Sequence, residues 1–228
     1  MVDRSTHVAL AVVLRVRDGR LQVLLWQRGK PPFEGAWALP GGALGNDETL
    51  EESIRRHLAA KVDVREVTHL EQLATKSDPG RVPGRRELAT AYLGLVPVDA
   101  DPSLPGDTNW HPIDDLPEMA FDHGEIALLA RERLRAKLSY TNAGFALAPD
   151  SFTVAELRDL YAAALGYDVS ATNLQRVLLR RGVLEQTGER RDSGPSGGRP
   201  PALFRFRSRE LEVTDPAAVL SPPSRRRS

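Results

Sequence analysis

The chain has 228 residues, of which 41% are hydrophobic and 27% are charged, and its formal net charge is zero. That length and apolar share suit one large domain or two small ones with real cores. The sequence has no cysteine, which excludes disulfide bonds and cysteine-based zinc or iron–sulfur sites. We expect a cytoplasmic protein without a signal peptide or a membrane partner, because no apolar run approaches the ~20 residues of a membrane span.

The charges are spread unevenly along the chain. From Thr141 to the end there are thirteen arginines, no lysine and ten carboxylates. Within residues 171–209, nine arginines stand against only three carboxylates. An acidic first part and a locally basic second part predict different partners for the two parts.

The first elements are two strands and a helix. Residues 8–14 and 21–26 are apolar runs separated by Asp18-Gly19, which is a strong signal for a β-hairpin. A helix is predicted from Asp47, which can cap it, to about Val62. Its apolar residues recur at a spacing of four and give one buried stripe, formed by Leu50, Ile54, Leu58 and Val62.

Residues 42–64 resemble the Nudix box, and the run 37–42 resembles the usual approach to it. Five positions fit the pattern of the box: Gly42, Glu48, Arg56, Leu58 and Val64. The three later glutamates of the pattern are replaced by His57, Ala60 and Lys61, and Asp63 stands in place of its last glycine. The resemblance implies a Nudix α/β/α sandwich over about residues 5–140 and a structural ion pair between Glu48 and Arg56.

The replaced glutamates indicate that the chemistry of the box has been lost. Nudix-type cleavage uses Mg²⁺, which prefers oxygen ligands and usually carboxylates. His57, Ala60 and Lys61 are expected on one flank of the helix, and an ammonium there repels the ion. Glu51 and Glu52 lie a turn or more earlier, where acidic residues suit the helix dipole. We therefore expect no metal site, no catalytic residue and no required cofactor, but a pocket kept for sensing.

Cations and aromatic rings cluster just before the box. Arg28 and Lys30 can neutralise a diphosphate, while Phe33 and Trp37 offer flat apolar surfaces for a base. These four residues are the candidate effector-binding residues, with Arg56 and Glu87 as weaker candidates. The alternative is a loop with two solvated cations and two core aromatics.

Two more strands are predicted at 67–75 and 88–98, followed by a helix at 124–138. A second helical region then begins with Thr153 and Glu156, which form a capping box, and its first helix ends at Gly166. Ser170 can cap the next helix, which extends to about residue 181.

This second helix has an exposed polar face suited to reading the major groove of DNA. Asparagine can pair with an adenine edge, and arginine can pair with a guanine edge or a phosphate. The candidate residues are Thr172, Asn173, Arg176 and Arg180. Strands at 183–187 and 202–207 enclose a basic loop, like the wing of a winged helix, and its arginines would reach the backbone or minor groove: Arg190, Arg191 and Arg199. The alternative is a small helical domain with solvated charges.

The predicted fold class is α/β: a Nudix-like domain at 1–140, a linker at 141–150, a winged helix-turn-helix domain at 151–212 and a disordered tail at 213–228. This combination resembles the Nudix-related transcriptional regulators of NAD metabolism over nearly the whole chain. The resemblance implies a homodimeric repressor of NAD biosynthesis or salvage genes that binds a palindromic operator in double-stranded DNA. It also implies release from DNA by ADP-ribose or a related nucleotide.

Two other functions stay open from the sequence. One is a Nudix-type pyrophosphatase that takes its metal ligands from elsewhere and carries a DNA-binding domain. The other is an adaptor that uses both domains to bind proteins.

Overall fold

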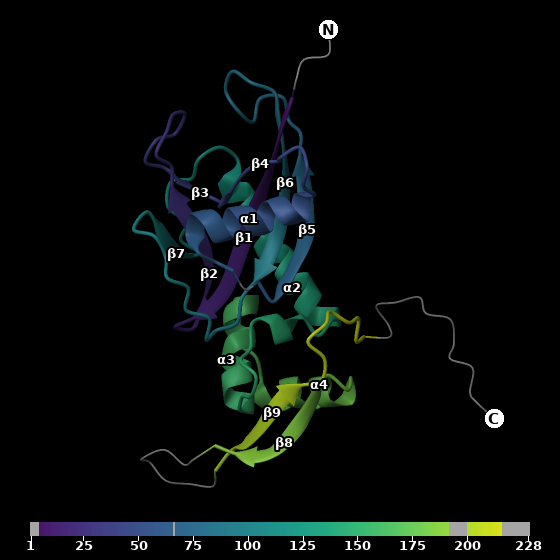
Figure 1. Cartoon of the computed structure of the whole chain (residues 1–228). Coiled ribbons are helices and arrows are strands. Elements are labelled where there is room, and N and C mark those ends of the chain that lie inside the picture. The colour runs from purple at the N-terminus through teal and green to yellow at the C-terminus, as the bar shows by residue number, and fades with distance from the viewer. Residues whose placement is uncertain (1–4, 66, 192–199, 216–228) are drawn as a thin grey trace, which may run out of the picture. The chain divides into compact units, whose positions relative to one another are not determined.

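The computed structural model describes residues 5–65, 67–191 and 200–215 (Figure 1). The chain divides into two compact units, Met1–Arg133 and Leu134–Ser228. Among the described helices, none combines the length and the apolar character that crossing a membrane requires.

The first unit is built on a mixed sheet. Its strands are β1 (Thr6–Arg17), β2 (Arg20–Gln27), β3 (Trp37–Ala38), β4 (Gly41–Ala43), β5 (His69–Lys76), β6 (Glu87–Leu95) and β7 (Thr108–Pro112). The order is β3-β2-β1-β6-β5, with β4 paired to β1 and β7 paired to β2. Only the β1–β6 pairing is parallel. The four strands predicted from the sequence are confirmed, whereas β3, β4 and β7 were not predicted.

The turn between β1 and β2 is the predicted hairpin. Arg17 lies opposite Arg20, so Asp18 and Gly19 form a two-residue loop. Both have positive φ, 53° and 70°, as a type I′ turn requires.

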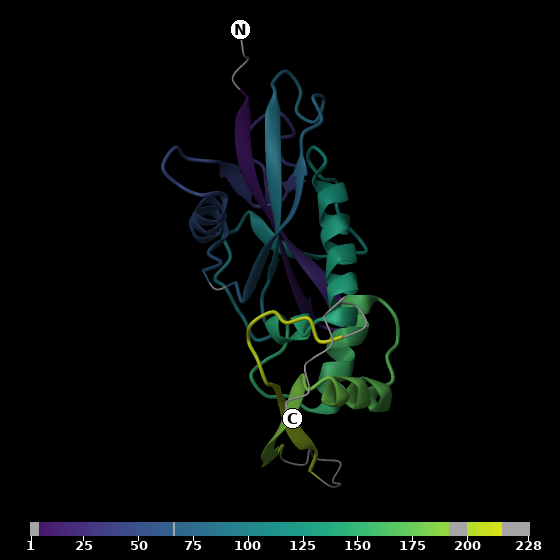
Figure 2. The ribbon, with the colours of Figure 1, turned by 90° about the vertical axis from the view of Figure 1, so that its right-hand side faces the viewer.

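Two helices cover the sheet, α1 (Leu50–Val62) on one face and α2 (His123–Tyr140) on the other (Figure 2). The predicted stripe of α1 is confirmed, since Ile54, Leu58 and Val62 are buried in a cluster with the β1 residues Ala9 and Ala11. Residues 9–14 of β1 are all buried because both faces of the strand are covered.

The start of α1 differs from the prediction. Thr49, not Asp47, is the N-cap: its hydroxyl accepts the Glu52 N–H at 3.2 Å, and the Glu52 carboxylate accepts the Thr49 N–H at 2.7 Å. This reciprocal capping box satisfies two backbone donors at once. Asp47 lies in the preceding turn, two residues too early to do so.

The second unit contains the 3₁₀ helix η1 (Ala143–Ala146), α3 (Val154–Leu165), α4 (Ala171–Arg180) and the antiparallel pair β8 (Leu184–Arg190) and β9 (Ala202–Phe206). The predicted caps are confirmed: Thr153 and Glu156 form a capping box, Gly166 ends α3 at φ 78°, and Ser170 caps α4. The predicted strand at 183–187 extends three residues further, to Arg190, in β8. Arg190, which we had assigned to the wing loop, therefore belongs to the strand.

Residues 141–150 are not the linker that we expected. Residues 141–148 are all buried, and the ring of Phe145 is 1% exposed. A β-carbon on Gly144 would lie 2.6 Å from the Tyr161 hydroxyl oxygen, so this segment packs directly against α3. An apolar run is stabilised by burial, and here it belongs to the core of the second unit.

The expected disordered tail does not begin at 213. Val213 forms a β-bridge with Thr141, the Thr214 N–H donates to the Tyr140 carbonyl at 2.8 Å, and Asp215 pairs with Arg181 at 2.6 Å. These bonds hold residues 213–215 to the second unit. The remainder of the expected tail, 216–228, lies outside the described residues.

Candidate functional site

A cavity of about 510 Å³ opens in the first unit beside β4 and the start of α2. Its size is typical of small-molecule pockets. Four cations and one carboxylate are among its lining residues, together with two aromatic rings: Arg28, Lys30, Lys61, Arg85, Glu87, Trp26 and Phe121. A lining of this composition suits an anionic ligand that carries a flat ring.

Lys61 reaches the cavity from the last turn of α1. Its ammonium donates to the Gly41 carbonyl at 2.6 Å and lies 4.6 Å from the centre of the Trp26 ring. The ring is held in turn, because the Trp26 indole N–H donates to the Leu39 carbonyl at 3.1 Å. Burial, followed by the charges of Arg28 and Arg56, lowers the pKa of Lys61.

His57 fills the space between α1 and β4. Its Nε2 lies 3.1 Å from the Ala43 carbonyl oxygen, and its ring packs so closely on Gly42 that a β-carbon there would collide with it. Burial is the main cause of a lowered pKa for His57. Because a carbonyl oxygen can only accept, the His57 Nε2–H donates to Ala43. Ala60 is exposed on α1 and offers no ligand group.

Glu48 and Arg56 form the ion pair that the resemblance implies. The Arg56 guanidinium donates to both carboxylate oxygens of Glu48, at 2.5 and 2.8 Å, and the Gly45 N–H donates at 2.7 Å. The guanidinium is the first cause that lowers the pKa of Glu48 to about 2. Arg56 is not among the residues that line the cavity.

Among the other candidates, Arg28 and Lys30 line the cavity, while Phe33 and Trp37 do not. Arg28 donates to the Pro32 carbonyl at 3.0 Å, and its guanidinium lies 4.7 Å from the centre of the Phe121 ring. Phe33 packs edge-on against Phe121 with centroids 4.9 Å apart, so it supports that ring from outside the cavity. Trp37 of β3 packs on His111 of β7, with ring centroids 4.2 Å apart.

A buried cluster of charged side chains holds the part of the cavity wall that contains Glu87 and His123. Arg81 donates to Asp122 at 2.7 and 3.2 Å and to Glu87 at 3.1 Å, and its side chain is 2% exposed. The neighbouring His123 accepts the Leu39 N–H at Nδ1, and burial lowers the pKa of His123 to about 3. His123 is therefore neutral, with its proton on Nε2.

Among the charged and aromatic residues that line the cavity, four were not singled out from the sequence: Trp26, Arg85, Phe121 and His123. Trp26 is two residues from Arg28 on an alternating strand, which is a local signal that could have found it. Arg85 and Phe121 come from loops and His123 from the first turn of α2, all far along the chain, and no local pattern marks them.

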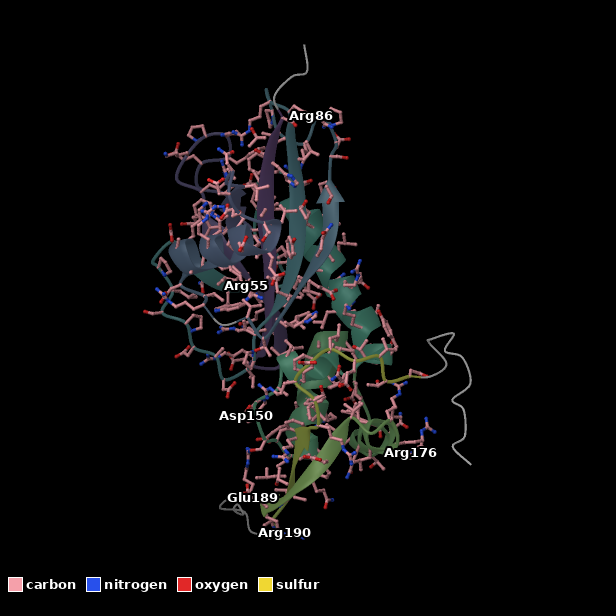
Figure 3. The ribbon with its side chains drawn as sticks, turned by 45° about the vertical axis from the view of Figure 1, so that its right-hand side comes forward. Arg55, Arg86, Asp150, Arg176, Glu189 and Arg190 are labelled. Atoms are coloured by element: carbon pink, nitrogen blue, oxygen red, sulfur yellow. The ribbon has the colours of Figure 1, made fainter. Side chains whose placement is uncertain are left out.

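The candidate reading residues lie on the exposed face of α4. Thr172, Asn173, Arg176 and Arg180 are all exposed, and Figure 3 shows the Arg176 side chain directed away from the ribbon. The Arg176 guanidinium donates to the Asn173 side-chain oxygen at 2.8 Å. The two therefore form one polar unit with donors still free to face a partner.

The basic wing is only partly described. Arg190, labelled in Figure 3 at the end of β8, donates to the Pro200 carbonyl at 2.9 Å. Arg191 forms an ion pair with Glu156 of α3. Arg199, the third candidate, lies outside the described residues.

Known proteins that resemble the chain identify its family. The NUDIX domain family matches residues 5–130, and the NrtR DNA-binding winged helix domain matches residues 144–206. A curated relative from Acinetobacter baylyi, described as the ADPR responsive transcriptional repressor NtrR, is 30% identical over 92% of this chain and 85% of its own length. The chain belongs to the NrtR family.

Two solved structures of an NrtR protein from Shewanella oneidensis are similar to the chain. One is a complex with a 27mer DNA, at 33% identity and a TM-score of 0.76, covering 87% of this chain and 92% of the other. The second is the NUDIX domain of that NrtR in complex with ADP ribose, at 34% identity and a TM-score of 0.53, covering 58% of this chain and 90% of the other. The Nudix fold followed by a winged helix is thus the NrtR architecture.

Proposed function

We propose that this protein is a transcriptional repressor that binds DNA through its winged helix and releases it when ADP-ribose or a related nucleotide fills the Nudix cavity. The observation that carries the proposal is a cavity with four cations and two aromatic rings in the same chain as the exposed polar face of α4. The relatives support both halves, since one NrtR was solved with DNA and its NUDIX domain with ADP ribose.

The nucleotide is held by Arg28, Lys30, Lys61 and Arg85 through its diphosphate and by Trp26 and Phe121 through a base. Cations match a diphosphate, and an aromatic face matches a base by stacking. Phe33, Trp37 and Arg56, which the sequence placed in this site, are not among the lining residues, and Phe33 contacts the lining residue Phe121.

On the DNA side, Asn173 and Arg176 read base edges, while Thr172, Arg180, Arg190, Arg191 and Arg199 bind the backbone. A homodimer presents two such faces to a palindromic operator, whose half-sites lie about one helical turn, or a multiple of it, apart. The regulated genes are those of NAD biosynthesis or salvage, and the protein acts in the cytoplasm.

Nucleotide binding acts by shifting the population between DNA-binding and released forms. A ligand shifts such an equilibrium only by its differential affinity for the two forms, which is typically ~1–3 kcal/mol. A rearrangement that spoils the spacing of the two reading faces is enough to lose the operator.

The same domain does not hydrolyse its nucleotide. Of the three box positions that normally carry glutamate, His57 bonds to Ala43, Lys61 bonds to Gly41, and Ala60 is exposed. In the described residues, no group of three or more His, Asp or Glu side chains is arranged to hold a metal ion.

The deciding experiment is a selection of genomic fragments bound by the full chain, with and without ADP-ribose. We expect recovery of a palindromic sequence, and at least a fivefold loss of its binding when ADP-ribose is present. Arg28→Ala should keep the DNA binding but lose the response to the nucleotide. Selection of no sequence, or binding indifferent to ADP-ribose, would contradict the proposal.

Hydrolysis is tested separately with ADP-ribose and Mg²⁺. We expect no turnover above the buffer blank. Turnover that disappears in Glu48→Gln or Glu51→Gln would instead establish a pyrophosphatase that uses the remaining carboxylates of the box.

A further inference from the structure

Positively charged side chains predominate in the lining of the cavity. Arg28, Lys30, Lys61 and Arg85 line it, and Glu87 is the one carboxylate among the lining residues. That carboxylate is already paired, with Arg81 at 3.1 Å and with Arg85 at 2.7 Å. The cavity therefore holds an excess of positive charge, which suits an anion and repels a divalent cation.

The fold family implies Mg²⁺ at the box, and the residues of this box do not fit it. Mg²⁺ requires oxygen ligands in near-octahedral geometry. Three glutamates on or just before α1 are engaged elsewhere: Glu48 with Arg56, Glu51 with Arg55, and Glu52 with Thr49. The Gly41 carbonyl, which could have been a ligand, accepts from Lys61 instead.

The Lys61 ammonium is fixed rather than free. It is held between the Gly41 carbonyl at 2.6 Å and the Trp26 ring at 4.6 Å, and Trp26 is itself fixed by Leu39. An ammonium has three donors, and the bond to Gly41 uses one of them. The remaining donors are available to phosphate oxygens in the cavity that this residue lines.

We propose that the Lys61 ammonium takes over the electrostatic role of the metal, so that the cavity binds the diphosphate of its nucleotide without a divalent cation. This inference rests on the proposed function, in which a nucleotide diphosphate is the ligand. It makes Lys61 the residue that both removes the cation requirement and holds the anion.

The first test is calorimetric titration of the full chain with ADP-ribose, once in EDTA and once in Mg²⁺. We expect dissociation constants equal within about twofold. Binding that strengthens tenfold or more with Mg²⁺ overturns the inference but leaves the repressor proposal intact. Absence of binding in both buffers overturns the assignment of ADP-ribose as effector, and this inference with it.

The second test compares two lysine variants in EDTA. Lys61→Met should weaken ADP-ribose binding by roughly tenfold to a hundredfold, as loss of a charge-assisted hydrogen bond typically does. Lys76→Met is the matched control, since Lys76 is a partly buried lysine of β5 outside the lining, and it should bind as the unaltered chain does. A folded Lys61→Met variant with unchanged affinity overturns the inference.

A third variant restores carboxylates to the positions that face β4. His57→Glu combined with Lys61→Glu should lose ADP-ribose binding in EDTA and regain it with Mn²⁺, and bound Mn²⁺ can be followed by its electron paramagnetic resonance signal without any nucleotide. Failure to bind Mn²⁺ in a folded double variant contradicts the role assigned to these positions. If Lys61→Met does not fold, the inference is decided by the dissociation constants of ADP-ribose for the unaltered chain in EDTA and in Mg²⁺.

Discussion

Helices α1 and α4 are anchored in the same way but use their polar faces differently. Each buries an apolar stripe, Ile54 and Leu58 in α1 and Leu174 and Leu178 in α4. In α1 the polar side chains bond within the first unit, as Lys61 does with Gly41. In α4, Arg176 bonds to Asn173 on the same helix, and both remain exposed.

This difference separates two ways of holding an anion. α1 places a cation inside a cavity and fixes it before the ligand arrives, which favours a small molecule of defined shape. α4 leaves arginine and asparagine on an open surface, where a large polyanion can approach and base edges can be read. Cationic side chains on the two helices therefore suit different kinds of anion because their surroundings differ.

The largest expected effect tests whether the buried stripes anchor the helices. Leu58→Ala removes a side chain that is 1% exposed, so we expect the free energy of unfolding to fall by about 2–5 kcal/mol. Leu179→Ala on α4, at 39% exposed, should change it by less than about 1 kcal/mol. Denaturant unfolding measures both. Equal losses for the two variants would mean that α4 buries Leu179 against a partner, such as a second copy of the chain.

The next largest expected effect tests DNA binding by the exposed polar face of α4. Arg176→Ala should weaken binding to the selected operator by about 1–3 kcal/mol and relax its sequence preference, since it removes a base-reading group and the partner of Asn173. The free energy of unfolding of this variant should stay within about 0.5 kcal/mol of that of the unaltered chain, because Arg176 is exposed.

The matched control for Arg176 is an exposed arginine on α1. Arg55→Ala loses only its bond to Glu51 and should leave DNA binding unchanged. Competition gel shifts with specific and scrambled DNA at several salt concentrations distinguish the two variants. An equal loss for both would show that charge alone, rather than the face of α4, determines binding.

Local patterns predicted the elements well because their causes are local. The stripe of α1, the Asp18-Gly19 turn and the caps at Thr153 and Ser170 each depend on residues within a few positions of one another. The N-cap of α1 was assigned to Asp47, whereas Thr49 caps the helix through its reciprocal bonds with Glu52.

Contacts between distant residues were beyond this kind of reasoning. The cavity combines Arg28 and Lys61 with Phe121 and His123, which are far apart in the sequence. Residues 141–150 were taken for a linker because they lie between two recognisable patterns. The burial of Gly144 against Tyr161 depends on a fold that no local signal describes.

A smaller effect compares the caps of the two helices. Thr49→Ala and Ser170→Ala should each lower the free energy of unfolding by about 1 kcal/mol, because each removes a side-chain acceptor from the first turn. Only Ser170→Ala should also weaken DNA binding, since Thr172 and Asn173 lie in the turn that it caps. Thermal unfolding and gel shifts measure the two effects, and a loss of DNA affinity in Thr49→Ala would contradict the separation.

The smallest effect is a dependence of stability on pH that belongs to α1 and not to α4. The pKa of Glu48 falls from 4.5 to about 2 on folding, chiefly because Arg56 donates to its carboxylate. The folded form thus binds fewer protons than the unfolded form between these values, so stability decreases as the pH falls. The contribution of Glu48 is fully present above about pH 4.5 and is lost as the pH falls through about 2. Glu48→Gln should flatten this part of the stability curve, whereas Asn173→Ala on α4 should leave it unchanged. Because the Arg56 side chain of the pair is 49% exposed, salt should weaken the effect. An identical acid profile for Glu48→Gln would show that the pair with Arg56 is equally formed in the unfolded chain.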